Sequence, residues 1–97
     1  MPAYSIVGVT VNDGALFQQY IDGHTDSLET FGGRFLAAGH DFELIEGSWP
    51  DQVFVIHEWP DQKAFRDWYA SEEYRPWKKM RHAAATANVV LIDGMPV

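Results

Sequence analysis

Cysteine is absent from this 97-residue sequence. The protein therefore has no disulfide framework, no thiolate nucleophile and no thiolate-based metal site. Basic side chains are few as well, because seven lysines and arginines stand against fourteen acidic residues and give a formal net charge of −7. A negatively charged protein repels phosphate backbones, so we expect no nucleic-acid partner.

Long apolar runs are also missing. No segment approaches the roughly 20 apolar residues that a membrane-spanning helix needs. The first residues lack the basic segment and apolar stretch of a secretory signal. We therefore expect a cytoplasmic protein with no membrane partner. The length suits a single domain over residues 1–97, and a domain of this size often gains stability from a partner.

The chain does contain apolar, β-branched segments that alternate with helical patterns. The predicted strands are residues 4–11, residues 34–38 with a continuation over 42–46, residues 53–58 and residues 88–93. The first predicted helix follows Asn12-Asp13, is weakened at residues 24–26 and ends at Gly32-Gly33. A short helix follows Asp61, and the last helix covers residues 76–85 after a turn capped by Ser71. Gly39-His40 predicts a bulge or bend, and residues 47–52 predict a hairpin turn.

The resulting order, β-α-β-β-α-β with an extra short helix, predicts an α+β, ferredoxin-like fold with an antiparallel four-stranded sheet and helices on one face. An antiparallel sheet with one solvated face should alternate apolar and polar residues. Here Val53 and Val55 point to one side while Phe54 and Ile56 point to the other, and all four are apolar. Because the helices cover one face only, we expect the second face to pack against another subunit in a two-fold homodimer.

Several segments together resemble a known family. They are Gly-Gly-Arg-Phe-Leu-Ala at 32–37, Glu-Gly-Ser-Trp-Pro at 46–50, Ile-His-Glu-Trp-Pro at 56–60, Trp-Tyr-Ala-Ser-Glu-Glu-Tyr at 68–74, and Arg81. On these segments the chain is similar to domain of unknown function family 1330, within the dimeric α+β barrel superfamily. The resemblance implies a ferredoxin-like fold and a barrel formed by two subunits, and it implies no settled activity. Two departures, His40 and Asp51-Gln52, replace a common glycine and a commonly basic stretch, which argues against an anion site built from basic residues there.

Two neighbouring residues of the third predicted strand are candidates for proton transfer. His57 continues the face of Val53 and Val55, where a shifted pKa would suit a general acid or base, although a hydrogen-bonded structural histidine fits the same position. Glu58 lies on the opposite face and needs a partner to remain charged when buried. We expect Arg34 or Arg81 to pair with it, since the guanidinium fork suits a carboxylate and would equally bind an acidic ligand.

The remaining candidates are ligand-binding residues. Tyr69 and Tyr74 bracket Ser71 between two helices and suit either a pocket mouth or the core, and Asn88 suits either a ligand contact or a turn. The four histidines show no metal-binding spacing, so we expect no metal site. There is no phosphate-binding loop and no nucleotide fingerprint, and we expect no cofactor.

Two classes of function fit these observations. The first is a small, cofactor-independent enzyme acting on a compact aromatic or acidic molecule in a pocket between sheet and helices. Members of the superfamily that the chain resembles include monooxygenases, isomerases and dehydratases. In this hypothesis Arg34 and Arg81 orient an anionic substrate, Tyr69 and Tyr74 donate hydrogen bonds, and His57 or Glu58 moves a proton. The second class is a binding or stress-related accessory protein with the same pocket and no turnover. A titratable group with a perturbed pKa inside the pocket would favour the enzyme.

Overall fold

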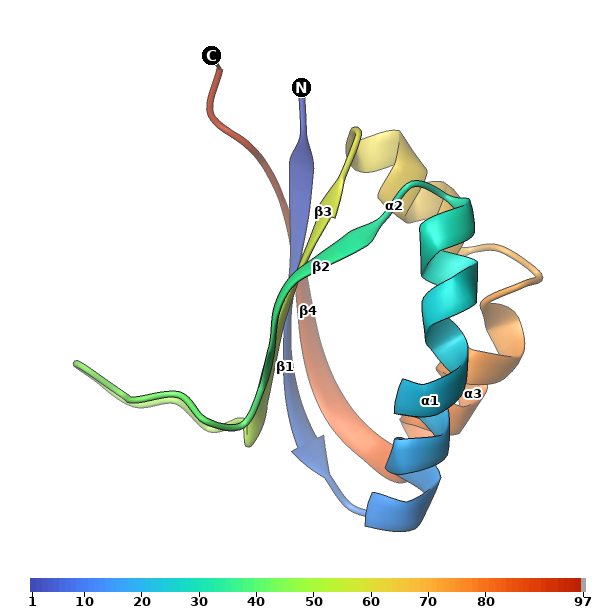
Figure 1. Ribbon diagram of the computed structural model, residues 1–97. Coiled ribbons are helices and arrows are strands. Elements are labelled where there is room, and N and C mark those ends of the chain that lie inside the picture. The colour runs from blue at the N-terminus through green and yellow to red at the C-terminus, as the bar shows by residue number, and fades with distance from the viewer. Residues whose placement is uncertain (97) are drawn as a thin grey trace.

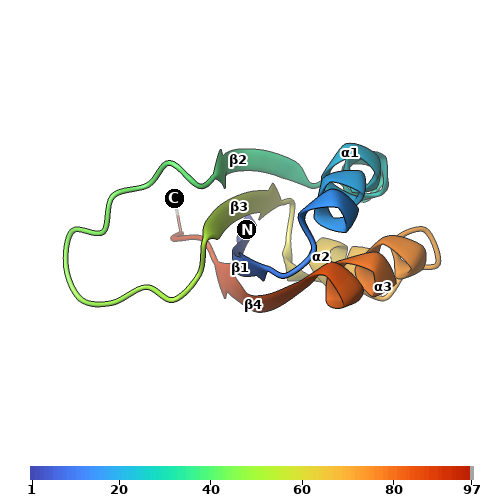
Figure 2. The same cartoon turned by 90° about the horizontal axis from the view of Figure 1, so that it is seen from below.

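The computed structural model describes residues 1–96 and shows a four-stranded sheet with three helices on one of its faces (Figure 1). The elements are β1 (Ala3–Val11), α1 (Gly14–Thr30), β2 (Arg34–Gly39), β3 (Val53–Trp59), α2 (Gln62–Tyr69), α3 (Arg75–Ala84) and β4 (Ala85–Asp93). The strands lie in the order β2-β3-β1-β4, and every neighbouring pair is antiparallel. The predicted α+β, ferredoxin-like arrangement is confirmed. Figure 2 shows the sheet and the helices as two layers.

Helix α1 begins and ends where the sequence predicts. Asp13 caps it, because its carboxylate accepts a hydrogen bond from the backbone N–H of Leu16 at 3.1 Å. At the other end Gly32 takes a φ of +88°, a conformation that glycine adopts without strain. The expected weakness at residues 24–26 is absent, and the helix continues from Gly14 to Thr30. The reason is that His24 belongs to the buried stripe, which consists of Phe17, Tyr20, His24, Ser27 and Leu28.

Helices α2 and α3 meet at a turn that Ser71 holds together. Its hydroxyl donates to the carbonyl of Trp68 at 2.7 Å and accepts from the backbone N–H of Tyr74 at 3.1 Å. Ser71 therefore starts the turn between the helices, as predicted, but it is not the helix cap that the sequence suggested, because the N-cap of α3 is Tyr74. Strand β4 starts at Ala85, directly after α3 and three residues earlier than the predicted 88. Asn88 therefore lies inside β4 and does not close the turn before it.

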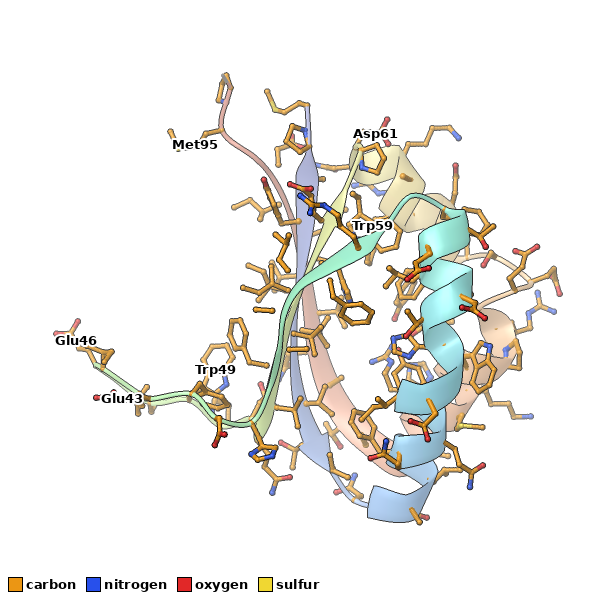
Figure 3. The ribbon with its side chains drawn as sticks, in the orientation of Figure 1. Glu43, Glu46, Trp49, Trp59, Asp61 and Met95 are labelled. Carbon is orange, nitrogen blue, oxygen red and sulfur yellow. The ribbon has the colours of Figure 1, made fainter. Side chains whose placement is uncertain are left out.

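The segment after β2 differs most from the prediction. Residues 42–46 form no strand, and a long loop over residues 40–52 replaces the expected hairpin turn. Figure 3 shows this loop extending away from the sheet, with Glu43 and Glu46 near its far end. The side chains that suggested a strand have no strand to pair with here, and Ile45 is 83% exposed. The irregular register that was expected at Gly39-His40 lies instead between Phe35 and Ala37.

Hydrogen bonds attach the loop of residues 40–52 to the sheet at the C-terminal end of the loop. The carboxylate of Asp51 accepts hydrogen bonds from the Thr10 hydroxyl at 3.3 Å and from the Asn88 amide at 3.2 Å. The backbone N–H of Gln52 donates to the carbonyl of Val9 at 2.8 Å. Asp51 thereby lies against Gly8 of β1, which offers the space because it has no side chain.

The sheet has an inner face toward the helices and an outer face away from them. The inner face and the helices enclose the core, which is formed by Val9, Phe17, Tyr20, Leu28, Trp59, Phe65, Trp68, Tyr74, Ala84 and Ala85. The outer face is also apolar, but no helix or strand within residues 1–96 covers it (Figure 1). Leu36, Val90 and Ile92 remain 45%, 56% and 54% exposed. Both faces of the strands are therefore apolar, as the sequence predicts. Among the residues described, no helix is both long and apolar enough to cross a membrane.

Candidate functional site

A cavity of about 620 Å³ lies between the inner face of the sheet and the helices. Its wall is mainly apolar, with valines from β1, β3 and β4 and aromatic side chains from α1, β2 and α2. The principal apolar residues are Val7, Val9, Val53, Val55, Val89, Phe17, Phe35, Phe65 and Trp68. The polar side chains in the wall are Tyr20, His24, Thr25, His40, His57, Tyr69, Tyr74 and Arg81.

His57 reaches the cavity because side chains alternate along β3, which places it on the same face as Val53 and Val55. It is only 5% exposed. Its Nδ1 lies 2.8 Å from the hydroxyl of Ser5, and this hydroxyl accepts a hydrogen bond from the indole N–H of Trp59 at 2.9 Å. Figure 3 shows Trp59 near the end of the sheet that adjoins α2. Nε2 of His57 is buried and has no hydrogen-bond partner within residues 1–96.

Burial lowers the pKa of His57 from its usual 6.5 to about 4, and the proximity of His24 adds to this effect. The imidazole is therefore neutral at pH 7. A titratable group with a strongly perturbed pKa in the wall of a cavity is the feature that distinguishes an enzyme from a simple binding protein in the hypotheses above.

His24 is a residue of the site that the sequence did not single out. It lies on α1, and its Nδ1 is 2.8 Å from the backbone carbonyl of Tyr20. The imidazole stacks on the Tyr20 ring with 4.1 Å between centroids. Burial lowers the pKa of His24. The signal that could have identified it is its helical spacing from Phe17, Tyr20 and Leu28, which places it on the buried side of α1.

Arg81 provides a positive charge in the cavity wall. It is 4% exposed, and its terminal nitrogen donates a hydrogen bond to the Tyr69 hydroxyl at 3.2 Å. Its Nε has no partner in the described chain, and no carboxylate of residues 1–96 forms an ion pair with it. Burial acts to lower the pKa of Arg81, but the neighbouring phenol groups of Tyr74 and Tyr20 outweigh it and raise the pKa. The guanidinium therefore stays charged.

The tyrosines divide between packing and polar contacts. The hydroxyls of Tyr20 and Tyr74 lie 2.7 Å apart and share a hydrogen bond, and burial raises the pKa of both phenols. Tyr74 also packs on Trp68 with 3.9 Å between ring centroids. Tyr69 directs its hydroxyl to Arg81. Both tyrosines named from the sequence, Tyr69 and Tyr74, thus line the cavity beside Arg81.

Three of the predicted site residues lie outside this cavity. Glu58 follows His57 in β3, so it points to the outer face, where it accepts hydrogen bonds from Arg34 at 2.7 Å and from the Tyr4 hydroxyl at 3.2 Å. The hydrogen bond from Arg34 is the main reason why the pKa of Glu58 is lowered. Asn88 also belongs to the outer face, where it holds Asp51.

The expectation that Arg34 and Arg81 together orient one substrate is wrong. The two side chains lie on opposite faces of the sheet, because Arg34 pairs with Glu58 outside while Arg81 faces the cavity. Glu58, the carboxylate that needed a partner, pairs with Arg34, which lies opposite it in the register of β2 and β3. Within residues 1–96, no group of three or more histidine or acidic side chains could hold a metal ion.

A sequence comparison with protein families matches residues 2–95 to the family described as Domain of unknown function (DUF1330). The chain belongs to this family. The predicted resemblance is therefore confirmed over almost the whole DUF1330 chain. The curated proteins contain no match to it.

Solved structures with the same fold are similar to this DUF1330 protein at low sequence identity. The RPA0582 protein of unknown function from Rhodopseudomonas palustris has a TM-score of 0.82 and 17% identity, over 99% of this chain and 84% of its own. SnoaB, a cofactor-independent oxygenase from Streptomyces nogalater, has a TM-score of 0.71 and 19% identity, over 99% of this chain and 95% of its own. A dimeric ferredoxin-like protein of unknown function from Jannaschia sp. CCS1 has a TM-score of 0.69 and 13% identity, over 97% of this chain and all of its own. At these identities the likeness shows a shared fold.

Proposed function

We propose that this DUF1330 protein is a small enzyme that binds a compact aromatic molecule carrying an anionic oxygen and moves a proton on it. The observation that carries the proposal is Arg81, a buried guanidinium that contacts phenols and has no acidic partner in the described chain. A buried charge without a counter-charge is costly, and an anionic ligand group would supply that counter-charge. The free Nε–H of Arg81 is a donor for such a group.

The shape and lining of the cavity support the same class of ligand. A volume of about 620 Å³ lies within the range of small-molecule sites, roughly 300–1,000 Å³. Valines and aromatic rings cover most of its wall, which suits a ring or a short apolar chain. The polar groups are few, so they would fix the orientation of the ligand by one end.

Catalysis is favoured over simple binding by the two histidines in the wall. Both have lowered pKa values and are neutral at pH 7, so each has one protonated and one bare ring nitrogen and can take part in proton transfer. The fold is shared with SnoaB, which is described as a cofactor-independent oxygenase. We therefore place the reaction among the cofactor-independent monooxygenase, isomerase or dehydratase types, as an analogy at the level of the fold. The alternative is an accessory protein that binds the same ligand without turnover.

The proposed assembly is a homodimer formed through the outer face. Leu36, Val90 and Ile92 expose an apolar surface that the helices leave uncovered, and an exposed apolar patch of this kind marks an interaction site. Figure 1 shows the loop of residues 40–52 projecting on the same side of the sheet. A second copy would cover the face with its own outer face, in a two-fold arrangement. Two of the proteins that share this fold are themselves described as dimeric.

Benzoate and benzamide test the ligand class, because the two molecules share a ring and differ in charge. We expect the wild-type protein to bind benzoate at least about tenfold more tightly than benzamide in isothermal titration calorimetry, since one charge-assisted hydrogen bond contributes about 1.5–3 kcal/mol. Arg81→Met should remove this preference, and Arg81→Lys should keep part of it. Circular dichroism of both variants controls for folding. Equal affinity for the two probes in the folded wild type would refute the proposal.

Turnover separates an enzyme from a binding protein. The ligands that bind most tightly can be incubated with the wild type in air and in deuterated water, and the products followed by mass spectrometry. Incorporation of oxygen, loss of water or exchange of a carbon-bound proton that depends on His24 or His57 would identify an enzyme. Tight binding without any of these changes would support the accessory role instead.

A further inference from the structure

The two histidines in the cavity wall have hydrogen-bond partners that fix different tautomers. A backbone carbonyl can only accept a hydrogen bond, so Nδ1 of His24 must carry the proton that it shares with the Tyr20 carbonyl. A neutral imidazole carries one ring proton, so Nε2 of His24 has a free lone pair. His24 therefore faces the ligand as a hydrogen-bond acceptor and as a base.

The hydrogen-bond chain at His57 leads to the opposite tautomer. The indole of Trp59 can only donate, so the Ser5 hydroxyl accepts from it and has its own proton left to give. Ser5 is fully buried, and its other neighbour in the chain is Nδ1 of His57. If Nδ1 carried a proton, the hydroxyl proton of Ser5 would have no acceptor in this buried place. Nδ1 is therefore the acceptor, and Nε2 of His57 carries the ring proton and donates.

We propose that His24 is the proton acceptor of the cavity, and that Nε2–H of His57 and the guanidinium of Arg81 bind the oxygen from which the proton is taken. This inference rests on the proposed function, since it specifies which side chain performs the proton transfer. It differs from the assignment made from the sequence, in which His57 or Glu58 moves the proton. Ser5 and Trp59 are then positioning residues, because they act through His57. Ser5 contacts Nδ1 of the imidazole, and Trp59 donates a hydrogen bond to the Ser5 hydroxyl.

The proton transfer balances without another reactant. The ligand O–H bond breaks, an N–H bond forms at Nε2 of His24, and the electron pair stays on the oxygen. The protein gains one positive charge, and the ligand gains one negative charge. Arg81 stabilises this oxyanion, and the N–H of His57 adds a hydrogen bond to it. The ligand class is therefore a phenol or an enol on an apolar frame, whose oxygen becomes the anionic oxygen of the proposed ligand once the proton has moved to His24.

The surroundings of both imidazoles are defined by their packing. His24 is bordered by the Tyr20 ring on α1, by the Phe35 ring of β2 at 5.8 Å between centroids, and by the charge of Arg81 on α3. His57 contacts the same Phe35 ring, with 4.8 Å between centroids. The Phe35 ring thus contacts both imidazoles, and both line the same cavity. No carboxylate of residues 1–96 takes part in this group.

The tautomers can be read directly in the wild-type protein without any ligand. In protein labelled with ¹⁵N-histidine, two-bond proton–nitrogen correlations distinguish a protonated ring nitrogen from a bare one. At neutral pH we expect His24 as the Nδ1–H form and His57 as the Nε2–H form, each in at least about tenfold excess. His40 and His82 are exposed and provide internal references that exchange between both forms. Ser5→Ala should leave His24 unchanged and release His57 into a mixture. An Nδ1–H form of His57, or an Nε2–H form of His24, overturns the assignment.

The proton transfer can be followed with 4-nitrophenol, whose phenolate absorbs visible light. At a pH where the free phenol is mostly protonated, binding to the wild type should produce the phenolate band. His24→Phe keeps a stacked ring but removes the acceptor, so the probe should bind with the band lost. His24→Asn serves as a second variant, and His82→Phe is the matched control, because His82 is exposed and does not line the cavity. A band that persists in both His24 variants overturns the proposal.

The two readouts separate this inference from the proposed function. If benzoate and 4-nitrophenol both fail to bind, the proposed ligand class is wrong, and the tautomers of the free protein still decide the roles of His24 and His57. If the probes bind and the tautomers are reversed, the ligand class stands and the assignment of the base falls.

Discussion

Gly8 of β1 lies directly beneath the carboxylate of Asp51 on the outer face of the sheet. Its φ is not in the positive region, so the backbone accepts alanine, but an added Cβ would lie 2.8 Å from Cγ of Asp51 and closer still to Oδ2. Gly8→Ala must therefore displace the Asp51 side chain from the hydroxyl of Thr10 and the amide of Asn88. The substitution tests whether this contact holds the loop of residues 40–52 on the sheet.

The cost follows from the contacts that are lost. Two hydrogen bonds to a carboxylate contribute about 1.5 kcal/mol each at the lower end of their range, and both are long here. Alanine in a strand is more favourable than glycine by roughly 0.5–1 kcal/mol. We expect Gly8→Ala to lower the free energy of unfolding by about 2 kcal/mol. For a domain of this length that corresponds to a decrease in Tm of roughly 8–16 °C.

A thermodynamic cycle makes the prediction sharp. In an Asp51→Ala background the carboxylate is gone and only the Cβ of residue 51 remains, 3.1 Å from the added Cβ, so Gly8→Ala should cost far less there than in the wild type. Urea unfolding followed by circular dichroism, at one fixed protein concentration, measures all four proteins. Gly14→Ala is the matched control, because nothing lies within 4 Å of a Cβ added there. An equal loss from Gly8→Ala in both backgrounds would refute the reasoning.

Three further predictions concern pH, assembly and the outer face. The pKa of His57 is lowered from 6.5 to about 4, so its contribution to the free energy of unfolding is complete above pH 6.5 and is lost as the pH falls toward 4. The total loss is about 3 kcal/mol. His57→Phe should flatten this part of the pH profile measured by urea unfolding. Val90→Lys should convert the proposed dimer to monomers in sedimentation equilibrium, whereas Gln19→Lys on the solvent side of α1 should not. A wild-type monomer at micromolar concentration would contradict the proposed dimer. Arg34→Met should cost less than about 1 kcal/mol, because the Arg34 side chain is 66% exposed, and should leave benzoate affinity unchanged; a large loss of affinity would contradict the placement of Arg34 outside the site.

Most of the fold could be predicted from local signals. Asp13 and Gly32 delimit α1, Asp61 caps α2, and the apolar residues on both sides of β3 show that each face of the sheet needs a cover. These features depend on neighbouring residues and on the alternation of side chains, which the sequence contains. The loop of residues 40–52 could not be predicted in this way. Its apolar residues resemble a strand, but a strand forms only where a neighbouring strand offers hydrogen bonds, and here none does.

The candidate site was only partly predictable. His57, Tyr69, Tyr74 and Arg81 do line one cavity, and alternation along β3 was enough to place His57 on the inner face. Which of the two arginines pairs with Glu58 was not predictable, because the pairing depends on the register between β2 and β3. His24 was missed because an isolated histidine in a helix has no motif. Its role comes from the Tyr20 carbonyl and the Phe35 ring, and the ring is brought to it by the fold.

The positions of the tryptophans allow fluorescence to report separately on the cavity and on the outer face of the sheet. Trp59 is hydrogen-bonded to Ser5 behind His57, and Trp68 lines the cavity, so an aromatic ligand should quench their fluorescence. Trp49 lies on the loop of residues 40–52 and is partly exposed, which makes its emission wavelength sensitive to burial by a second subunit (Figure 3). Replacing Trp49 with Phe would leave a signal dominated by the interior. This variant would report ligand entry, and the difference between its emission and that of the wild type would report subunit pairing, with no dye attached.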